Sequence, residues 1–121
     1  MSRKVLIVED YADVRTMMKI LITRSGYDVI EAADGYEALE KVRRYHPDII
    51  LMDLAMPLLD GVTATRIIRN FKGCENVPII AISAYGNAYY EKAVATGCNQ
   101  VINKPLDFKG IKPLLNQYLS Q

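Results

Sequence analysis

The chain has 121 residues, of which 50% are hydrophobic, and its 15 basic and 14 acidic side chains give a formal net charge of +1. This length and composition predict a single domain, residues 1–121, with a buried core, and they argue against a disordered chain. The near-neutral charge is spread along the chain, which excludes the basic surface of a dedicated nucleic-acid binder.

Short apolar runs alternate with helical patterns five times, which is typical of a parallel sheet with crossover helices. The first, third and fourth runs are continuously apolar, as strands covered on both faces are. The second and fifth are short and flanked by polar residues, so we expect them at the edges of the sheet. The runs expected to form strands are residues 5–8, 29–30, 49–52, 79–82 and 101–102.

The segments between these runs carry apolar side chains at helical spacing. Gly26 and Gly97 are natural ends for the first and fourth helices. A proline deep inside a helix loses a hydrogen bond and clashes with the preceding turn, so we expect the fifth helix to begin near Gly110, with Pro113 in its first turn. The stripes expected to be buried are Val14, Met17, Met18, Leu21 and Ile22; Ala38, Leu39, Val42 and Tyr45; Ala64, Ile67, Ile68 and Phe71; Tyr90, Ala93 and Val94; and Ile111, Leu114, Leu115, Tyr118 and Leu119.

Right-handed crossovers between strands with these edges favour the strand order 2-1-3-4-5. The predicted fold class is therefore α/β, a five-stranded parallel sheet doubly wound with five helices. In such sheets a ligand binds beyond the carboxyl ends of the strands, where the order reverses, which here is between the first and third strands. The candidate site therefore lies among the residues that end strands one, three, four and five.

Those strand ends carry three carboxylates, one hydroxyl and one ammonium: Glu9, Asp10, Asp53, Ser83 and Lys104. Three converging carboxylates repel one another unless a cation lies among them, and hard oxygen ligands suit Mg²⁺. A carboxylate beside Mg²⁺ can attack phosphorus to form an acyl phosphate, while the ammonium and the hydroxyl stabilise the oxygens of the transferred group. Taken alone, each residue also fits a plain structural reading, such as a strand-terminating Asp or a solvated Lys; only their joint placement is specific.

From Val5 to Leu119, the sequence resembles the receiver domain of two-component response regulators. The resemblance implies the flavodoxin-like receiver fold, and it rests on several motifs at the expected places. They are Val8-Glu9-Asp10, Leu51-Met52-Asp53-Leu54, Met56-Pro57, Asp60-Gly61, Ser83-Ala84 and Lys104-Pro105.

Carried over position by position, the resemblance implies that Asp53 accepts a phosphoryl group from a phosphohistidine. Asp10 and Asp53, with the backbone carbonyl of Ala55, are then expected to hold Mg²⁺, and Glu9 to act largely through bound water. Lys104 is expected to pair with the phosphoryl oxygens. The remaining expectations are that Ser83 moves toward those oxygens, that the surface of helix four, strand five and helix five switches partner binding, and that Asp60-Gly61 and Pro57 are structural.

Several positions depart from the commonest family pattern. Val101 stands where the family usually has an aromatic residue that takes part in switching, and Leu106 replaces a frequent Phe. The segment 83–97 is about one residue shorter than expected, and Tyr85, Tyr89 and Tyr90 are candidates to replace the missing aromatic in part. Ala55 and Tyr85 flank the phosphorylation site and are expected to influence the access of water to an acyl phosphate.

Three alternatives remain: a phosphatase, a flavodoxin-like binding module and an inactive receiver. A haloacid-dehalogenase-like phosphatase uses the same chemical groups, but it carries an Asp-x-Asp motif and usually a cap, whereas here Asp53 is followed by Leu54-Ala55 and no insertion is long enough for a cap. A flavodoxin-like binding module would need a Gly-rich phosphate loop after the first strand, where this chain has Glu9-Asp10-Tyr11. An inactive receiver that serves only for protein contacts is disfavoured by the complete acidic, Ser and Lys set.

We therefore expect a signalling phosphoacceptor rather than an enzyme that turns over small substrates. Its expected partners are a sensor histidine kinase or histidine phosphotransfer protein and a downstream protein target, and it is expected to be a monomer or weak homodimer. Apolar runs too short to span a bilayer, and the absence of a signal peptide, predict a cytoplasmic protein without membrane insertion. Cys74, Cys98 and a single His46 predict neither a disulfide framework nor a standard zinc site. The chain is expected to be a stand-alone receiver, although a domain cut from a larger protein would look the same.

Overall fold

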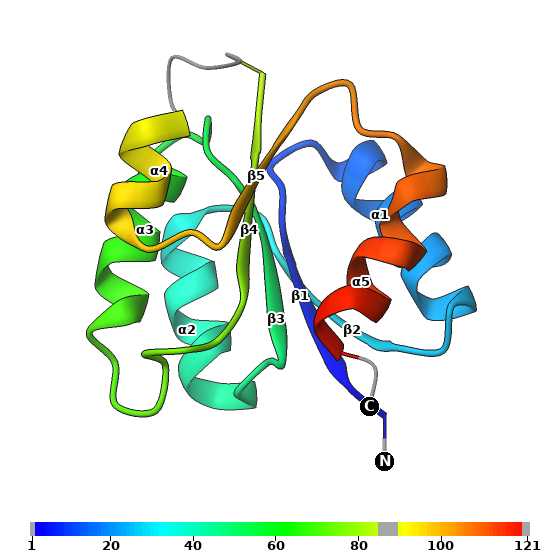
Figure 1. Cartoon of the computed structure of the whole chain (residues 1–121), viewed down its shortest axis with the longest axis horizontal. Helices are drawn as coiled ribbons and strands as arrows, with labels where there is room; N and C mark the ends of the chain where they lie inside the picture. Colours follow the sequence, from blue (N-terminus) through cyan, green and yellow to red (C-terminus); the bar gives the residue numbers. More distant parts are fainter. Residues whose placement is uncertain (1, 85–89, 120–121) are drawn as a thin grey trace.

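The structure is a computed structural model that describes residues 2–84 and 90–119. Strands and helices alternate along the whole of this range (Figure 1). The elements are β1 (Lys4–Val8), α1 (Ala12–Arg24), β2 (Asp28–Ala32), α2 (Gly35–Tyr45), β3 (Ile49–Asp53), α3 (Gly61–Arg69), β4 (Ile79–Ser83), α4 (Tyr90–Thr96), β5 (Gln100–Asn103), a short 3-10 turn (Phe108–Gly110) and α5 (Ile111–Leu119).

All five strands are parallel and lie in the order β2-β1-β3-β4-β5, which confirms the predicted topology. Helices α2, α3 and α4 cover one face of the sheet, and α1 and α5 cover the other (Figure 1). Alternate residues of each strand point to opposite faces, so the central strands fill two cores at once and are continuously apolar. The face covered by α2, α3 and α4, called the α2–α4 side, buries Leu6, Val8, Ile50, Met52, Ile79 and Ala81. The face covered by α1 and α5 buries Val5, Ile7, Ile49, Leu51, Ile80 and Ile82.

The helix ends follow the local sequence signals. Helix α1 stops at Arg24, and Gly26 takes the left-handed backbone conformation, with φ 97°, that the turn into β2 requires. The side chain of Asp34 caps α2 by accepting a hydrogen bond from the N–H of Glu37 at 2.9 Å. Helix α5 begins at Ile111, directly after the 3-10 turn, so Pro113 lies in the first turn as predicted.

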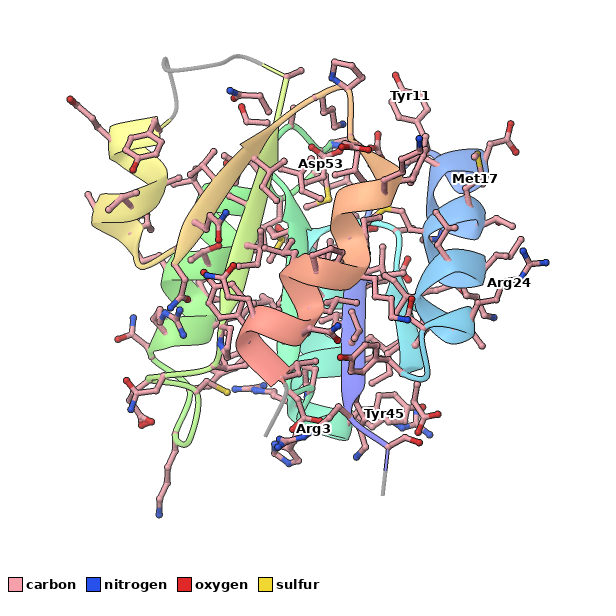
Figure 2. The ribbon with its side chains drawn as sticks, turned by 45° about the vertical axis from the view of Figure 1, so that its right-hand side comes forward. Arg3, Tyr11, Met17, Arg24, Tyr45 and Asp53 are labelled. Carbon is pink, nitrogen blue, oxygen red and sulfur yellow. The ribbon has the colours of Figure 1, made fainter. Side chains whose placement is uncertain are left out.

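The predicted helical stripes are wider than the faces that are buried. Met18 and Ile22 of α1 fill the core, but the adjacent Met17 points outward (Figure 2). A helix that rests on a sheet buries only a narrow stripe, and residues at the edge of that stripe stay in solvent. The side chains that the stripes wrongly place in the core are Met17 (50% exposed), Tyr45 (36%), Tyr90 (50%) and Val94 (44%).

Two further predictions concern membrane-spanning helices and the cysteines. No helix within residues 2–84 or 90–119 is long and apolar enough to cross a membrane. Cys74 and Cys98 are free and buried, and burial raises the pKa of both thiols. The protein therefore holds its cysteines as small core side chains rather than as a disulfide.

Residues from the two ends of the strands lie at opposite edges of the molecule. Asp53 and Tyr11 lie at the carboxyl-terminal edge of the sheet, whereas Arg3 and Tyr45 lie at the other edge (Figure 2). The candidate functional residues end strands or come shortly after them, so the fold brings them to the first of these edges.

Candidate functional site

Backbone pairing aligns the strand ends that carry the site. Strand β1 is paired with β3 as far as Met52, and Asp53 pairs with Ile82 of β4. The N–H of Lys104 donates to the carbonyl of Ser83 at 2.8 Å, which keeps the end of β5 beside the end of β4. The alignment fixes which side chains face one another beyond the sheet.

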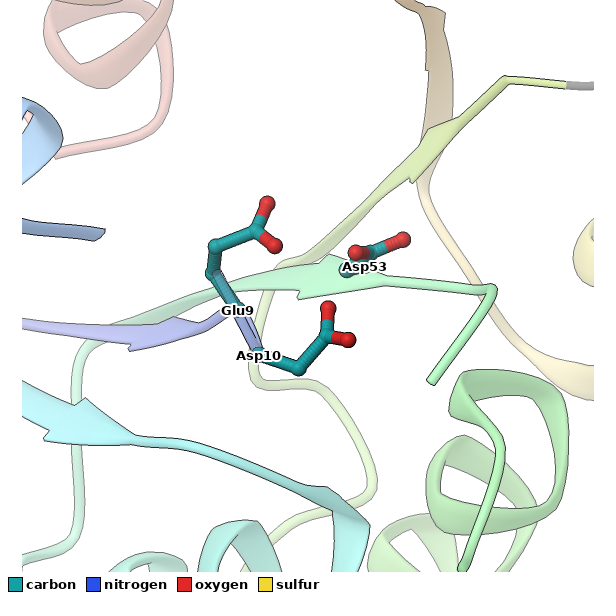
Figure 3. A group of neighbouring side chains, drawn as sticks. All are labelled: Glu9, Asp10 and Asp53. Atoms are coloured by element: carbon teal, nitrogen blue, oxygen red, sulfur yellow. The ribbon is translucent and has the colours of Figure 1, made fainter. Parts of the chain in front are cut away.

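Three carboxylates meet at this edge (Figure 3). Glu9 and Asp10 follow β1, and Asp53 is the last residue of β3. One carboxylate oxygen of each residue lies within 4.8 Å of the corresponding oxygens of the other two. Glu9 and Asp53 are buried, with 2% and 1% of their surface exposed, and Asp10 is half-buried. The acidic cluster predicted from the sequence is therefore present as a group of neighbouring side chains.

Lys104 supplies a positive charge to the cluster. Its Nζ lies 3.1 Å from Oδ2 of Asp53 and 3.8 Å from Oε1 of Glu9. Burial lowers the pKa of Lys104, but the negative charge of Asp53, with those of Glu9 and Asp10, outweighs burial and raises it. The ammonium therefore stays charged at neutral pH and points at the carboxylate that ends β3.

Near neutral pH, Glu9 is present in both its protonated and its ionised form. Burial, which has the largest effect, and the charge of Asp53 raise the pKa of Glu9, whereas a hydrogen bond from the N–H of Tyr11 and the charge of Lys104 lower it; the net result is a pKa of about 7. In the neighbouring Asp10, Oδ1 is buried and has no hydrogen-bond partner among the described residues. One ammonium among three carboxylates thus leaves negative charge and one oxygen without compensation.

The donor set fits a divalent cation. Carboxylate oxygens from three residues, partly open to water, are ligands that Mg²⁺ prefers, and an oxygen without a partner is explained if a cation takes it. The candidate ligands Asp10 and Asp53 both belong to this group, whereas Lys104 lies on the side of Asp53 and Glu9.

The other two predicted site residues also lie at this edge. Ser83, the last residue of β4, is fully buried. Ala55 is exposed, and its backbone N–H donates to Oδ1 of Asp53 at 3.0 Å. Because Oδ1 accepts from Ala55 and Oδ2 from Lys104 at 3.1 Å, the carboxylate of Asp53 is fixed at both oxygens.

The loop that follows Asp53 is pressed against the sheet by the start of α3. Asp60 caps this helix by accepting hydrogen bonds from the N–H and the hydroxyl of Thr63, both at 2.9 Å. The next residue, Gly61, approaches so closely that a Cβ there would lie 2.4 Å from the carbonyl oxygen of Asp53. Asp60-Gly61 therefore has the structural, helix-starting character predicted from the sequence.

The structure also shows an anchoring residue that the sequence motifs do not reveal. Arg15 of α1 donates from Nη1 to the backbone carbonyl of Glu9 at 2.7 Å and from Nε to Oε1 of Glu31 at 3.3 Å. It thereby ties the end of β1 to α1 and β2. The only sequence signal is a basic residue in a helix that begins beside the acidic pair, which is too common to point to this contact.

A hollow of about 370 Å³ opens beside the site. Glu9 and Lys104 lie at its inner side, Tyr11 is among its exposed walls, and much of its lining is apolar, including Met18 and Phe108. It is bounded by α1 and by the segment that connects β5 to α5. The edge that carries the carboxylates therefore also offers a mostly apolar depression.

Positions that depart from the usual receiver pattern are placed as follows. Val101 lies on β5, half-buried against the core on the α2–α4 side, and Leu106 packs against the core on the other side. Tyr90 begins α4 and is 50% exposed. Tyr85 and Tyr89 lie outside the described residues.

The amino-acid sequence is similar to those of known proteins. The sequence profile described as "Response regulator receiver domain" matches residues 5–116. The polar-differentiation response regulator DivK of Brucella ovis is 32% identical over 120 residues, which cover 98% of each chain. The CAI-1 autoinducer sensor kinase/phosphatase CqsS of Vibrio cholerae is 38% identical over 108 residues, which cover 88% of this chain but 16% of that much longer protein.

Solved structures agree with the sequence comparison. The chemotaxis protein CheY4 of Vibrio cholerae superposes with a TM-score of 0.93 at 28% identity, covering 98% of this chain and all of the other. The receiver domain of a sensor histidine kinase from Pseudomonas aeruginosa, described with a magnesium ion coordinated in its active-site cleft, has a TM-score of 0.91 at 32% identity, with 100% of both chains covered. Since the profile spans all five strands and DivK matches nearly from end to end, this chain belongs to the response regulator receiver family.

Proposed function

We propose that this receiver is a Mg²⁺-dependent phosphoacceptor in which Asp53 carries the phosphoryl group. The observation that supports this most directly is the setting of the Asp53 carboxylate, which is buried, fixed at both oxygens and faced by Lys104 on one side and by Glu9 and Asp10 on the other. A carboxylate that only ends a strand does not require a fixed ammonium and two further carboxylates beside it. A carboxylate that attacks phosphorus does, because the ammonium and a cation held by the carboxylates stabilise the charge of the transferred group.

The proposed reaction is a transfer from a phosphohistidine to Asp53. An oxygen of the carboxylate attacks phosphorus, a P–O bond forms, the P–N bond breaks, and the imidazole leaves with the electron pair and takes up a proton. Asp10, Asp53 and the carbonyl of Ala55 would hold Mg²⁺, with Glu9 acting through water, and the bound ion would neutralise charge on the phosphoryl oxygens. Lys104, already 3.1 Å from Asp53, pairs with a second oxygen, and Ser83 donates a hydrogen bond to a third.

The proposal includes the partners of the reaction. The phosphodonor is a sensor histidine kinase or a histidine phosphotransfer protein. We propose that apolar side chains of this donor pack into the hollow beside Lys104 that is lined by Tyr11, Met18 and Phe108. A downstream protein target is proposed to read the surface of α4, β5 and α5, where Tyr90 and Val94 are exposed. We further propose a cytoplasmic, monomeric or weakly dimeric protein that acts as a single receiver domain over residues 1–121.

The test is phosphorylation by acetyl phosphate in the presence of Mg²⁺, followed by intact-mass measurement. We expect one phosphoryl adduct on the wild-type protein and none on Asp53→Asn or after chelation of the metal. Asp28→Asn, which removes an exposed carboxylate on β2, is the matched control and should be phosphorylated like wild type. An undiminished adduct on Asp53→Asn would refute the assignment. Steady turnover of a phosphomonoester that needs Asp53 would instead favour a phosphatase.

A second prediction concerns the pH dependence of stability in metal-free buffer. The pKa of Glu9 is raised from 4.5 to about 7 in the folded protein, so between these values the folded state binds a proton that the unfolded state has lost. The contribution of Glu9 to the free energy of unfolding is therefore fully present below pH 4.5 and is lost as the pH rises to 7, by roughly 2–3 kcal/mol.

Urea unfolding at pH 5 and pH 7.5 measures this change. Glu9→Gln should remove most of the fall in stability, since its side chain does not titrate. The raised pKa of Lys104 acts only near and above pH 10.5, and the lowered pKa of Asp60 only below pH 3.8, so neither interferes in this range. A Glu9→Gln variant with the same pH profile as wild type would contradict the prediction. Mg²⁺, which requires ionised carboxylates, should stabilise the wild type more at pH 7.5 than at pH 5.

A further inference from the structure

A groove between α2 and α3 takes no part in the proposed phosphotransfer. It consists of two adjoining hollows of about 570 and 290 Å³, and Arg43 and Phe71 line both of them. The apolar part of its wall is formed by Leu39, Ile67 and Phe71, and Tyr36, at 60% exposure, stands at its rim. Such a volume accommodates several side chains of a partner.

Positive charge outweighs negative charge in the lining of this groove. Arg43, Arg44 and Lys72 line it, against the single carboxylate of Glu40. Among the described residues, no carboxylate lies within 4.0 Å of any of these three cations. Three positive charges against one negative charge leave the groove electropositive.

The guanidinium at the centre of the groove is held in place by an aromatic ring. Arg43 lies over Phe71, with its guanidinium carbon 4.5 Å from the ring centroid. A guanidinium that stacks on a ring keeps its N–H donors at its edges free to bind a carboxylate in the plane. Cations in the last turn of α2 also favour the helix dipole, but this effect does not explain Lys72, which lies beyond the end of α3.

We propose that the α2–α3 groove binds an acidic segment of a partner protein, with carboxylates that pair with Arg43, Arg44 and Lys72 and apolar side chains that pack on Leu39, Ile67 and Phe71. Two other occupants fit less well. A second copy related by two-fold symmetry would bring the same cations together. A nucleic acid needs more phosphate contacts than three cations supply, and it would meet the apolar wall and Glu40.

This proposal goes beyond the phosphoacceptor function and does not depend on it. His46, Asn70 and Lys72 place one end of the groove at the carboxyl ends of α2 and α3, whereas Asp53 lies at the edge of the sheet where both helices begin. The lining of the groove includes none of the three carboxylates and not Lys104, so a segment bound in the groove does not occupy the site proposed for phosphotransfer.

The experiment selects ligands from a displayed library of random dodecapeptides on the intact protein. We expect the enriched sequences to combine Asp or Glu with Leu, Phe or Trp. In fluorescence anisotropy, these peptides should bind Arg43→Glu and Lys72→Glu at least about ten-fold more weakly than wild type, and binding should weaken with salt.

Matched controls are Arg24→Glu on α1 and Lys112→Glu on α5, which reverse exposed charges outside the groove and should bind like wild type. Circular dichroism and urea unfolding like those of wild type show that the groove variants are folded, and because neither measurement uses phosphorylation, this test is separate from that of the proposed function. Enrichment of sequences without acidic residues, or equal binding to Arg43→Glu, overturns the proposal. So does a wild-type dimer in sedimentation that Arg43→Glu dissociates, or a homopolymer RNA that binds more tightly than every selected peptide.

Discussion

Replacing Arg69 by methionine is expected to lower the free energy of unfolding by about 3 kcal/mol. The guanidinium of Arg69, at the end of α3, binds the carbonyl oxygen of Gly97 from Nε at 3.0 Å and from Nη2 at 2.7 Å. Its Nη1 binds the carbonyls of Cys74 at 3.0 Å and Val77 at 2.6 Å, and Nη2 also binds Oδ1 of Asn99 at 3.0 Å. One side chain thus joins the segment before β4 to the segment before β5.

Methionine keeps the length of the apolar stem but provides no donors, so three carbonyl groups lose a partly buried, charged hydrogen bond. The same oxygen of Asn99 accepts the N–H of Ile79 at 2.9 Å, so the first residue of β4 loses support as well. Gly97 has φ 120°, and a Cβ there would lie 3.0 Å from Cγ of Arg69, which shows how closely the two chain segments meet.

Urea unfolding followed by circular dichroism measures the effect. Arg66→Met is the matched control: Arg66 lies on the same helix, is exposed, and forms no side-chain ion pair with any of the described residues, so its loss should change stability by less than about 0.5 kcal/mol. Arg69→Lys should recover less than half of the loss, because one ammonium cannot serve the separate acceptors. Equal stability of Arg69→Met and Arg66→Met would show that solvent replaces these hydrogen bonds.

Gly61→Ala is expected to destabilise the fold by about 2–3 kcal/mol and to slow phosphorylation by acetyl phosphate about 10- to 100-fold. The new Cβ would lie 2.4 Å from the carbonyl oxygen of Asp53 and 2.8 Å from Cα of Leu54. Both are backbone atoms, so the strain is relieved only by moving α3 or the chain that carries Asp53. The carboxylate would then shift relative to Lys104 and its acidic neighbours.

The control for this substitution is Gly110→Ala. A Cβ at Gly110 meets only Oδ2 of Asp107, at 3.8 Å, which is ordinary contact, so stability and phosphorylation should both stay close to wild type. Rates from intact-mass time courses and free energies from urea unfolding separate the two effects. A Gly61→Ala protein that is phosphorylated at the wild-type rate would mean that the helix, rather than the strand end, gives way.

Local patterns predicted much of this protein. The apolar runs gave the strands, their flanking residues gave the edges, and the crossover rule gave the strand order that the structure confirms. Pro113 located the start of α5 because a proline has few permitted places in a helix. Since parallel strands end at a common edge, the same reasoning led to the carboxylate cluster of Glu9, Asp10 and Asp53.

Contacts that depend on exact three-dimensional placement could not be predicted. The acceptors of Arg69 lie up to 30 positions away along the chain, and three of them are backbone carbonyls, which leave no mark in the sequence. The bond from Arg15 to the carbonyl of Glu9 is hidden in the same way. Helical spacing wrongly predicts that Met17 is buried, because spacing gives the direction of a helical face but not its width.

The division of the hydrophobic interior by the sheet has a consequence for insertions and deletions. Because Ile50 and Met52 face one core and Ile49 and Leu51 the other, adding one residue inside β3 would exchange the two sets. It would also turn the side chain at the end of the strand to the opposite side. An insertion or deletion of one residue in β3 is therefore expected to be strongly disruptive. Insertions and deletions should accumulate in the connecting segments, while the number of residues in β3 stays constant.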